Sequence, residues 1–352
     1  METYFSEVQL EHHPQQFMIA GRVVSPFETP DRAQLMADRF RKDGLKITTP
    51  ADHGRRPITV VHSDHYLDFL ESAFERFAQL PNAGPEAIPN VHPHVSALPD
   101  FRPRPTPRTQ GIVGQLGWYM GDLSSPIGPG TWRAAYASAQ SAIAAASAIR
   151  DGAREAMALC RPPGHHAYVD RCSGFCFLNN AAIAAEVLRQ RYSNVAILDF
   201  DTHHGDGTQA IFYARSDVFV GSHHTDPTDY YPFFAGYADE TGVGAGSGAN
   251  LNIPLPHGAD DDALVAASEQ LISAALAFGA EALVVSMGWD AHRDDPLSRL
   301  DVSDAAFSRL GSLYGNIPLP TLLVQEGGYS LQAIERVAPV FVSHFCAARA
   351  LS

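Results

Sequence analysis

The feature that most constrains the fold is a set of short runs of three or four residues that are apolar except for Thr321. They lie at residues 195–198, 218–220, 282–285 and 321–324. An apolar run without alternation is typical of a strand buried on both faces, as in a parallel sheet. Helical patterns precede or separate these runs, at residues 134–149, 180–191 and 261–278. The alternation predicts an α/β fold with a central, mostly parallel sheet and helices on both faces, in a single domain spanning residues 1–352.

Three of the apolar runs are followed at once by polar clusters. The first cluster starts at Asp199, the second at Ser286 and the third at Gln325. In a doubly wound sheet, ligands bind at the carboxyl ends of the strands. We therefore expect the three clusters to converge on one site.

Asp201, His203 and Asp290 are the candidate metal ligands. Alternate residues of an extended segment share a face, so Asp201 and His203 would point to the same side. Asp290, from a neighbouring strand end, would complete a set of two carboxylates and one imidazole. Such a set leaves a coordination position open for water and substrate, as in a catalytic zinc site. A lone Asp-x-His pair is weak evidence, but here it continues as His204-Gly205-Asp206-Gly207-Thr208.

Two adjacent histidines, His165 and His166, end the Pro/Gly-rich segment 161–166. In an irregular loop both rings can face one cavity. A hydrolytic reaction needs a base for the attacking water and an acid for the leaving group, and histidine titrates near neutral pH. Asp199 and Asp206 flank the metal motif, so each could orient one imidazole.

The third cluster contains Glu326-Gly327-Gly328-Tyr329. Two glycines permit backbone conformations that other residues avoid, so they can turn the tyrosine into the site. Its hydroxyl could then donate a hydrogen bond to a carbonyl oxygen as negative charge develops there.

The charge balance bears on the ligand. Asp and Glu number 39 against 25 Lys and Arg, which gives a formal net charge of −14. A surface that tracks phosphates needs the opposite sign, so we expect no nucleic-acid partner. An acidic field would attract cationic small-molecule substrates such as polyamines, or lysine-rich peptides, but the acidity taken alone is better explained as a means of keeping the protein in solution.

The sequence has neither a secretory signal pattern nor a convincing membrane span, so we expect a cytoplasmic protein without a membrane partner. Its four cysteines include one C-x3-C pair, Cys172 and Cys176, with no second pair beside it. They predict ordinary thiols, with neither a disulfide framework nor a structural zinc site.

A proline-rich segment interrupts the periodic pattern, with eight prolines between Pro81 and Pro107. Fixed φ angles favour an extended, semi-rigid chain over a helix or a central strand. We interpret residues 81–110 as an insertion loop that covers the site or makes a subunit contact. The alternative is a disordered linker.

Taken together, these motifs resemble the zinc-dependent histone deacetylase superfamily, which has the arginase-like α/β fold. The matching segments are residues 61–62 with 66–67, then 161–167, 174–180, 198–209, 288–296 and 326–329. Within the superfamily the chain looks similar to the bacterial acetylpolyamine amidohydrolases. That likeness rests on residues 4–7, 25–28, 128–132 and 234–242.

The resemblance implies roles for individual residues. Asp201, His203 and Asp290 would hold a single zinc ion (Zn2+), with ferrous iron (Fe2+) as an alternative. His166, paired with Asp206, would be the general base and later the acid, while His165, paired with Asp199, would support the transition state electrostatically. Tyr329 would polarise the acetyl carbonyl, and Gly174 and Phe175 would line a narrow tunnel. The family also implies a structural potassium ion (K+) near Asp199, Ser222 and His223, and a homodimer built by the proline-rich loop.

One departure concerns the tunnel mouth, where the polyamine branch uses acidic groups to hold the distant ammonium. This chain has Phe17 and Ser124 at the positions that align with those acids. Glu11 and Asp122 lie nearby in the sequence and are the candidates to replace them.

The expected activity is zinc-dependent removal of acetyl groups from acetylated polyamines or diamines, of the acetylputrescine or acetylcadaverine type. One alternative is an acetyl-lysine deacetylase that acts on proteins. A second is a dinuclear manganese ureohydrolase of the same fold, although it would need more bridging carboxylates than Asp201 and Asp290 supply. The non-enzymatic alternative is a ligand-sensing relative, which would be expected to lack ligands or the tyrosine.

Overall fold

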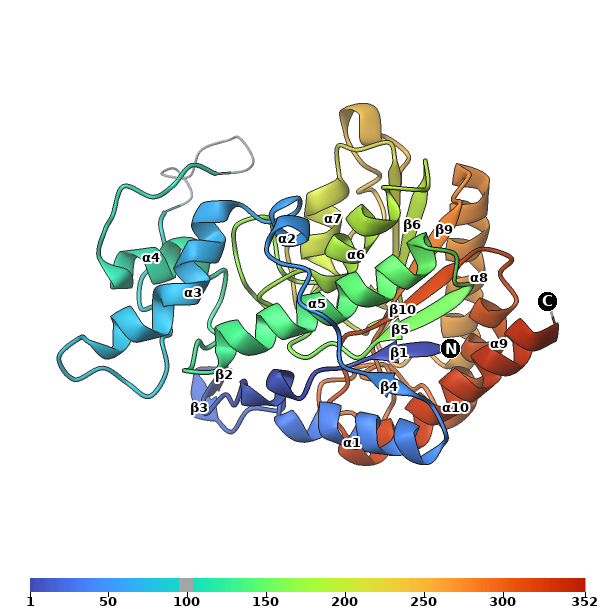
Figure 1. Ribbon diagram of the computed structural model, residues 1–352, viewed down its shortest axis with the longest axis horizontal. Coiled ribbons are helices and arrows are strands. Elements are labelled where there is room, and N and C mark those ends of the chain that lie inside the picture. Colours follow the sequence, from blue (N-terminus) through green and yellow to red (C-terminus); the bar gives the residue numbers. More distant parts are fainter. Residues whose placement is uncertain (95–103, 352) are drawn as a thin grey trace.

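A computed structural model describes residues 1–94 and 104–351, and its centre is a sheet with the strand order β4-β1-β5-β10-β9-β6-β7-β8 (Figure 1). Each neighbouring pair of these described strands runs parallel. The predicted α/β fold with a mostly parallel sheet is therefore confirmed. The strands are β1 Glu2–Tyr4, β4 Ile47–Thr48, β5 Glu155–Ala158, β6 Val195–Asp199, β7 Val218–Thr225, β8 Asn250–Leu255, β9 Ala282–Met287 and β10 Thr321–Gln325.

Helices cover both faces of the sheet because successive strand residues point to opposite sides. In β6, Val195 and Ile197 belong to one core, and Ala196 and Leu198 belong to the other. The first core is closed by α2 Arg56–Thr59, α3 Asp64–Ala78, α4 Ile112–Tyr119, α5 Thr131–Arg150, α6 Asn180–Leu188 and α7 Asp206–Phe212. The second is closed by α1 Pro30–Lys42, α8 Asp261–Phe278, α9 Asp304–Gly315 and α10 Leu331–Leu351.

Most of the predicted elements have nearly the predicted bounds. The helix expected at 261–278 is α8, and the helix expected at 134–149 is α5, which begins three residues earlier. The helix expected at 180–191 ends at Leu188, because the next residues form tighter turns in which Gln190 bonds Val187 and Arg191 bonds Leu188. The sequence analysis did not predict β1, β4, β5 and β8, nor the antiparallel pair of β2 Phe17–Ile19 and β3 Arg22–Val24.

Four strands that are neighbours in the sheet, β5, β10, β9 and β6, end at the same edge (Figure 1). The histidine pair follows β5, Glu326–Tyr329 follows β10, Asp290 follows β9, and Asp201 and His203 follow β6. Parallel pairing sets Asp199 of β6 beside Ser286 of β9, so the polar residues that follow begin at the same level. The sheet therefore gathers the predicted site residues at one place.

The proline-rich insertion is described at both ends but not over residues 95–103. Near its start, Ala87 and Ile127 exchange two backbone hydrogen bonds, because the N–H of each donates to the carbonyl oxygen of the other. On the far side, Arg104 forms a buried ion pair with Asp170 over 3.0 Å. The segment that was expected to cover the site or contact a second subunit lies partly outside the described residues, so that expectation stays a prediction.

Two further sequence expectations concern cysteines and membranes. Cys160, Cys172, Cys176 and Cys346 are all free thiols, as expected. Within the described ranges, no helix has both the length and the apolar character that crossing a membrane requires.

Shortening a side chain in a buried strand should leave a cavity and lower the free energy of unfolding. Ile197 in β6 is fully buried, so Ile197→Ala is expected to lower the free energy of unfolding by about 2–5 kcal/mol. Val60 is 61% exposed, and Val60→Ala should change it by less than about 0.5 kcal/mol. Urea titrations followed by circular dichroism measure both variants. Equal effects of the two substitutions would contradict the placement of β6 at the centre of the sheet.

Candidate active site

Asp201, His203 and Asp290 lie together at the carboxyl ends of β6 and β9. The Nδ1 atom of His203 is 3.0 Å from a carboxylate oxygen of Asp201 and 3.1 Å from one of Asp290. One ligand atom from each residue lies within 4.8 Å of the other two, and all three side chains are buried. The structure brings the predicted ligand set together at one point.

Tyr230 fixes the orientation of the His203 ring. Its hydroxyl oxygen is 2.8 Å from His203 Nε2, and the two rings stack with centroids 5.0 Å apart. The hydroxyl hydrogen is donated to the carbonyl oxygen of Leu297, so the tyrosine oxygen accepts the N–H of His203 Nε2. Nδ1 is then the ring nitrogen that faces Asp201 and Asp290, and it is the atom that would bind a metal once its proton is lost.

Gly327 makes room for the two carboxylates. A Cβ atom at this position would overlap the side chains of both Asp201 and Asp290. Its backbone N–H donates to a carboxylate oxygen of Asp201 over 2.8 Å. The first glycine of the Gly-Gly-Tyr motif is therefore required for close approach, in addition to the backbone freedom that the sequence suggested.

Two buried carboxylates at this separation favour a positive charge between them. Burial, reinforced by the charge of Asp201, raises the pKa of Asp290 to about 7. Burial lowers the pKa of His203, but hydrogen bonds with Asp201 and Asp290 outweigh it and raise that pKa to about 9. Two carboxylate oxygens and one imidazole nitrogen form a donor set that fits a divalent metal such as zinc.

His166 lies beside the ligand set and is oriented by Asp206. Its Nδ1 is 2.7 Å from one oxygen of Asp206, whose other oxygen accepts the hydroxyl of Tyr168 over 2.7 Å. A Cβ atom at Gly174, where φ is +56°, would overlap the imidazole, so the backbone there packs directly on the ring. Burial, together with the neighbouring His165, lowers the pKa of His166 to about 4. Its Nε2 is therefore unprotonated near neutral pH and able to accept a proton.

His165 is oriented by Asp199, and its electrostatic state differs from that of His166. Its Nδ1 is 2.9 Å from Asp199 Oδ2, and its ring centroid is 4.1 Å from that of His166. Burial lowers the pKa of His165, but the charges of Asp201 and Asp199 hold it well above its ordinary value. The adjacent rings thus form a cation beside a neutral base.

Tyr329 is held from its backbone and from its ring. Its backbone N–H donates to Asp295 over 2.6 Å, and the guanidinium carbon of Arg32 is 4.6 Å from its ring centroid. Burial raises the pKa of Tyr329 well above its ordinary value. The hydroxyl is therefore protonated and remains a hydrogen-bond donor.

An aromatic wall lies next to Tyr329. Phe175, which has a φ of +68°, packs against Tyr329 with ring centroids 5.5 Å apart and against Phe17 at 5.2 Å. Phe17 also meets Phe27 at 5.9 Å. Gly174 and Phe175 therefore lie beside His166 and Tyr329, and Phe17 extends the row of rings, while the tunnel that they were expected to line stays a prediction.

Asp122 lies next to the tunnel residues, whereas Glu11 is engaged elsewhere. One oxygen of Asp122 accepts the backbone N–H of Gly174 over 3.0 Å and the hydroxyl of Tyr231 over 2.7 Å, and the other accepts the hydroxyl of Ser124 over 2.7 Å. All of these donors are neutral. Glu11 forms an ion pair with Arg133 over 2.9 Å.

Several residues of the site were not assigned a role from the sequence. Arg32 and Asp295 hold Tyr329, Tyr230 orients His203, and Glu326 contacts the histidine loop. Glu326 and Asp295 lie inside segments that resemble the family's motifs, so the sequence offered a reason to assign them to the site. Nothing in the local sequence marks Tyr230, because its partner is 27 residues away.

The fold and the site together define a hydrolytic centre of the arginase/deacetylase type, with two histidines and a tyrosine hydroxyl around a set of metal-ligand residues. Comparison with known proteins agrees, since the histone deacetylase domain model matches residues 26–345. The chain therefore belongs to the histone deacetylase family and is a hydrolytic deacetylase.

Its relatives place the chain in the acetylpolyamine amidohydrolase branch. It is 47% identical to the acetylpolyamine amidohydrolase of Burkholderia pseudomallei, over 99% of this chain and 100% of the relative. It is 42% identical to acetylpolyamine amidohydrolase 1 of Pseudomonas aeruginosa, over 95% of both chains. A crystal structure of acetylpolyamine aminohydrolase from Burkholderia pseudomallei superposes with a TM-score of 0.94 at 46% identity, covering 99% of each chain.

The contact between Tyr230 and His203 predicts a specific effect on metal affinity. Tyr230→Phe removes the acceptor that fixes the His203 tautomer, so affinity for a divalent metal should fall by about 10–100-fold. Competition with a chromophoric chelator measures this affinity. Tyr237→Phe is the control, because the Tyr237 hydroxyl donates to Phe233 and does not touch a ligand. Equal affinities of the two variants would show that Tyr230 does not orient His203.

Proposed function

We propose that this chain is a zinc-dependent amidohydrolase that removes acetyl groups from acetylated polyamines or diamines and releases acetate and a free amine. The observation that carries the proposal is the convergence of the ligand set with His166 and Tyr329 around one buried point. The substrate class follows from relatives named acetylpolyamine amidohydrolase at 40–47% identity over nearly the whole chain.

Asp201, His203 and Asp290 would hold one zinc ion, or ferrous iron in its place. A bound ion of this kind acts as a Lewis acid on the acetyl carbonyl and lowers the pKa of a water molecule. A dinuclear manganese centre is disfavoured, because among the described residues this group contains only two carboxylates and one imidazole.

His166 would move the protons of the reaction. Asp206 holds its Nδ1, so the unprotonated Nε2 can take a proton from the attacking water. The same proton then passes to the amide nitrogen, and the carbon–nitrogen bond breaks to give acetate and the free amine. Asp206 keeps the ring in one orientation through both transfers.

His165 and Tyr329 would stabilise the negative charge that develops on the carbonyl oxygen. The Tyr329 hydroxyl is a protonated donor, and His165 contributes a fixed positive charge close to His166. Both groups are held in place before substrate arrives, so little reorganisation accompanies the reaction.

The surroundings of the tunnel favour a slender substrate with an apolar stem. Gly174, Phe175 and Phe17 would pack along the methylene chain. The described donors to the Asp122 carboxyl are all neutral groups, so Asp122 is the proposed partner of the distal ammonium in place of the acids absent at Phe17 and Ser124.

Two features implied by the family complete the proposal. A structural potassium ion would lie near Asp199, Ser222 and His223; Asp199 and Ser222 are paired in adjacent strands. A homodimer would use the proline-rich insertion.

Tyr329→Phe tests the oxyanion role. Loss of the donor should lower kcat by about 100–1,000-fold, as for other oxyanion donors, while metal content stays unchanged. Steady-state kinetics with metal analysis of the same preparation measures both. A variant that kept full turnover would rule out this role for the hydroxyl.

A substrate panel separates the two deacetylase activities. The enzyme should give a higher kcat/KM on acetylputrescine or acetylcadaverine than on an acetyl-lysine peptide, because the narrow aromatic wall and Asp122 suit a slim cation. The assay measures the release of acetate from each of these three substrates and from acetylspermidine as a fourth. A clear preference for the peptide would favour the protein deacetylase.

A further inference from the structure

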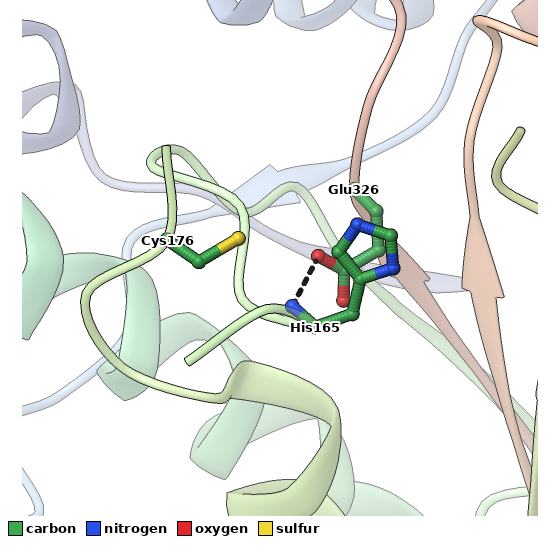
Figure 2. Close-up of side chains that lie close together, drawn as sticks. All are labelled: His165, Cys176 and Glu326. Carbon is green, nitrogen blue, oxygen red and sulfur yellow. Dashed lines mark hydrogen bonds between the residues drawn. The ribbon is translucent and has the colours of Figure 1, made fainter. Parts of the chain in front are cut away.

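Two loops that carry the catalytic groups are joined by one side chain, that of Glu326. Its carboxylate oxygen Oε2 accepts the backbone N–H of Gly164 over 2.6 Å and that of His165 over 3.1 Å. Figure 2 shows the carboxylate against the backbone nitrogen of His165. Glu326 follows β10 and lies three residues before Tyr329, so one residue connects the histidine loop with the tyrosine loop.

The backbone of Glu326 is itself fixed. Its N–H donates to the carbonyl oxygen of Met287, and its own carbonyl oxygen accepts from Arg32 over 2.8 Å. The side chain is completely buried, and within the described ranges no Lys or Arg side chain forms an ion pair with it. Burial raises the pKa of Glu326 to about 7. The charge of His165, the two backbone N–H groups and the hydroxyl of Ser286, which donates to Oε1 over 3.4 Å, oppose that effect of burial.

Glu326, His165 and Cys176 also lie close enough to suggest a second metal site, since their ligand atoms are within 4.8 Å of one another (Figure 2). Their bonding argues against that interpretation. His165 Nδ1 is engaged by Asp199, and the Cys176 thiol donates to the Gly174 carbonyl oxygen over 3.3 Å. Burial holds the pKa of Cys176 well above its ordinary value, so sulfur is a protonated thiol and a poor ligand. The cluster is therefore a structural contact.

The opposite side of the histidine loop leaves little freedom of movement. A Cβ atom at Gly164 would overlap the backbone nitrogen of Asn180, the first residue of α6. The side chain of Asn180 donates to the carbonyl oxygen of Pro162 over 3.2 Å. The loop is thus held between α6 on one side and the Glu326 carboxylate on the other.

We propose that Glu326 is a positioning residue that sets the distance between the histidine pair and Tyr329. It touches neither the tunnel wall nor the predicted ligand set through its carboxylate, so its effect on the reaction passes through Gly164 and His165. The two loops carry the proton-transfer group and the oxyanion donor, which must meet one amide. A displacement of about 1 Å between such groups can cost about 100-fold in rate.

The test compares Glu326→Ala with Glu326→Gln. The alanine variant frees two backbone N–H groups, so kcat should fall by about 100-fold while KM changes little. The glutamine variant keeps an acceptor oxygen for both N–H groups and should restore kcat to within about tenfold of wild type, since a neutral acceptor is weaker than a charged one. Both variants are assayed at saturating zinc, with the metal bound per chain measured in parallel.

Glu186→Ala is the matched control. Glu186 is a mostly buried carboxylate of α6 that pairs with Arg215 away from the site, so its loss should lower the melting temperature without lowering kcat. A Glu326→Ala variant with wild-type kcat would overturn the proposal. So would a glutamine variant as impaired as the alanine variant, or an impairment that excess zinc reverses.

The proposal rests on deacetylase chemistry and not on the polyamine substrate. All variants are therefore assayed on both acetylputrescine and an acetyl-lysine peptide. If the wild-type enzyme acts only on the peptide, the proposed substrate class is wrong, and the ratios of kcat on the peptide still test the role of Glu326.

Discussion

The site depends on one electrostatic constraint, the burial of Asp201 and Asp290 against the same imidazole nitrogen. Both carboxylates lie 3.0–3.1 Å from His203 Nδ1 in a fully enclosed position. Two negative charges taken out of water are costly unless a positive charge lies between them. The positive His165 contributes one such charge, and its Nε2 is 3.9 Å from Asp201. His203 supplies the other, because Tyr230 turns its Nδ1 inward between the two carboxylates, and Gly327 lets those carboxylates approach closely.

The parallel sheet makes this concentration of charge possible. Because β5, β10, β9 and β6 are neighbours, the four segments that follow their carboxyl ends supply the histidine pair, the tyrosine and all three ligand residues. Buried cores on both faces of the sheet fix the strands before the loops begin. A rigid scaffold is needed here, since repulsion between the carboxylates would otherwise separate the loops that carry them.

The sequence was most informative where apolar runs and polar residues adjoin. Val195–Leu198 is a strand buried on both faces, and the parallel pairing of its neighbours follows from that burial. Short strands escaped prediction: β1 and β4 have three and two residues, and β8 contains Asn250 and Pro254. These strands are defined by backbone pairing and leave no apolar run to detect. Site residues that belong to one motif, such as Asp201 and His203, could be grouped from the sequence. The contacts of Tyr230 and Arg32 could not, because they depend on the three-dimensional fold.

The site divides into a centre that follows the strands of the main sheet and an outer group of residues that does not. The residues proposed to act on the acetyl-amide follow central strands, where any shift of Asp199 or Glu326 disturbs several buried bonds at once. Phe17 of β2 and the segment around Asp122 lie outside that centre, and neither belongs to the eight-stranded sheet. Phe17 can therefore replace an acidic residue without disturbing Asp201 or His203. Phe17 meets the centre through Phe175, whose ring contacts Tyr329, whereas Asp122 meets it through Gly174 and Tyr231, which lie beside His166. Because Phe17 stands one ring further from Tyr329 than Phe175 does, a change at Phe17 should alter which amine binds more than the rate at which its acetyl group is removed.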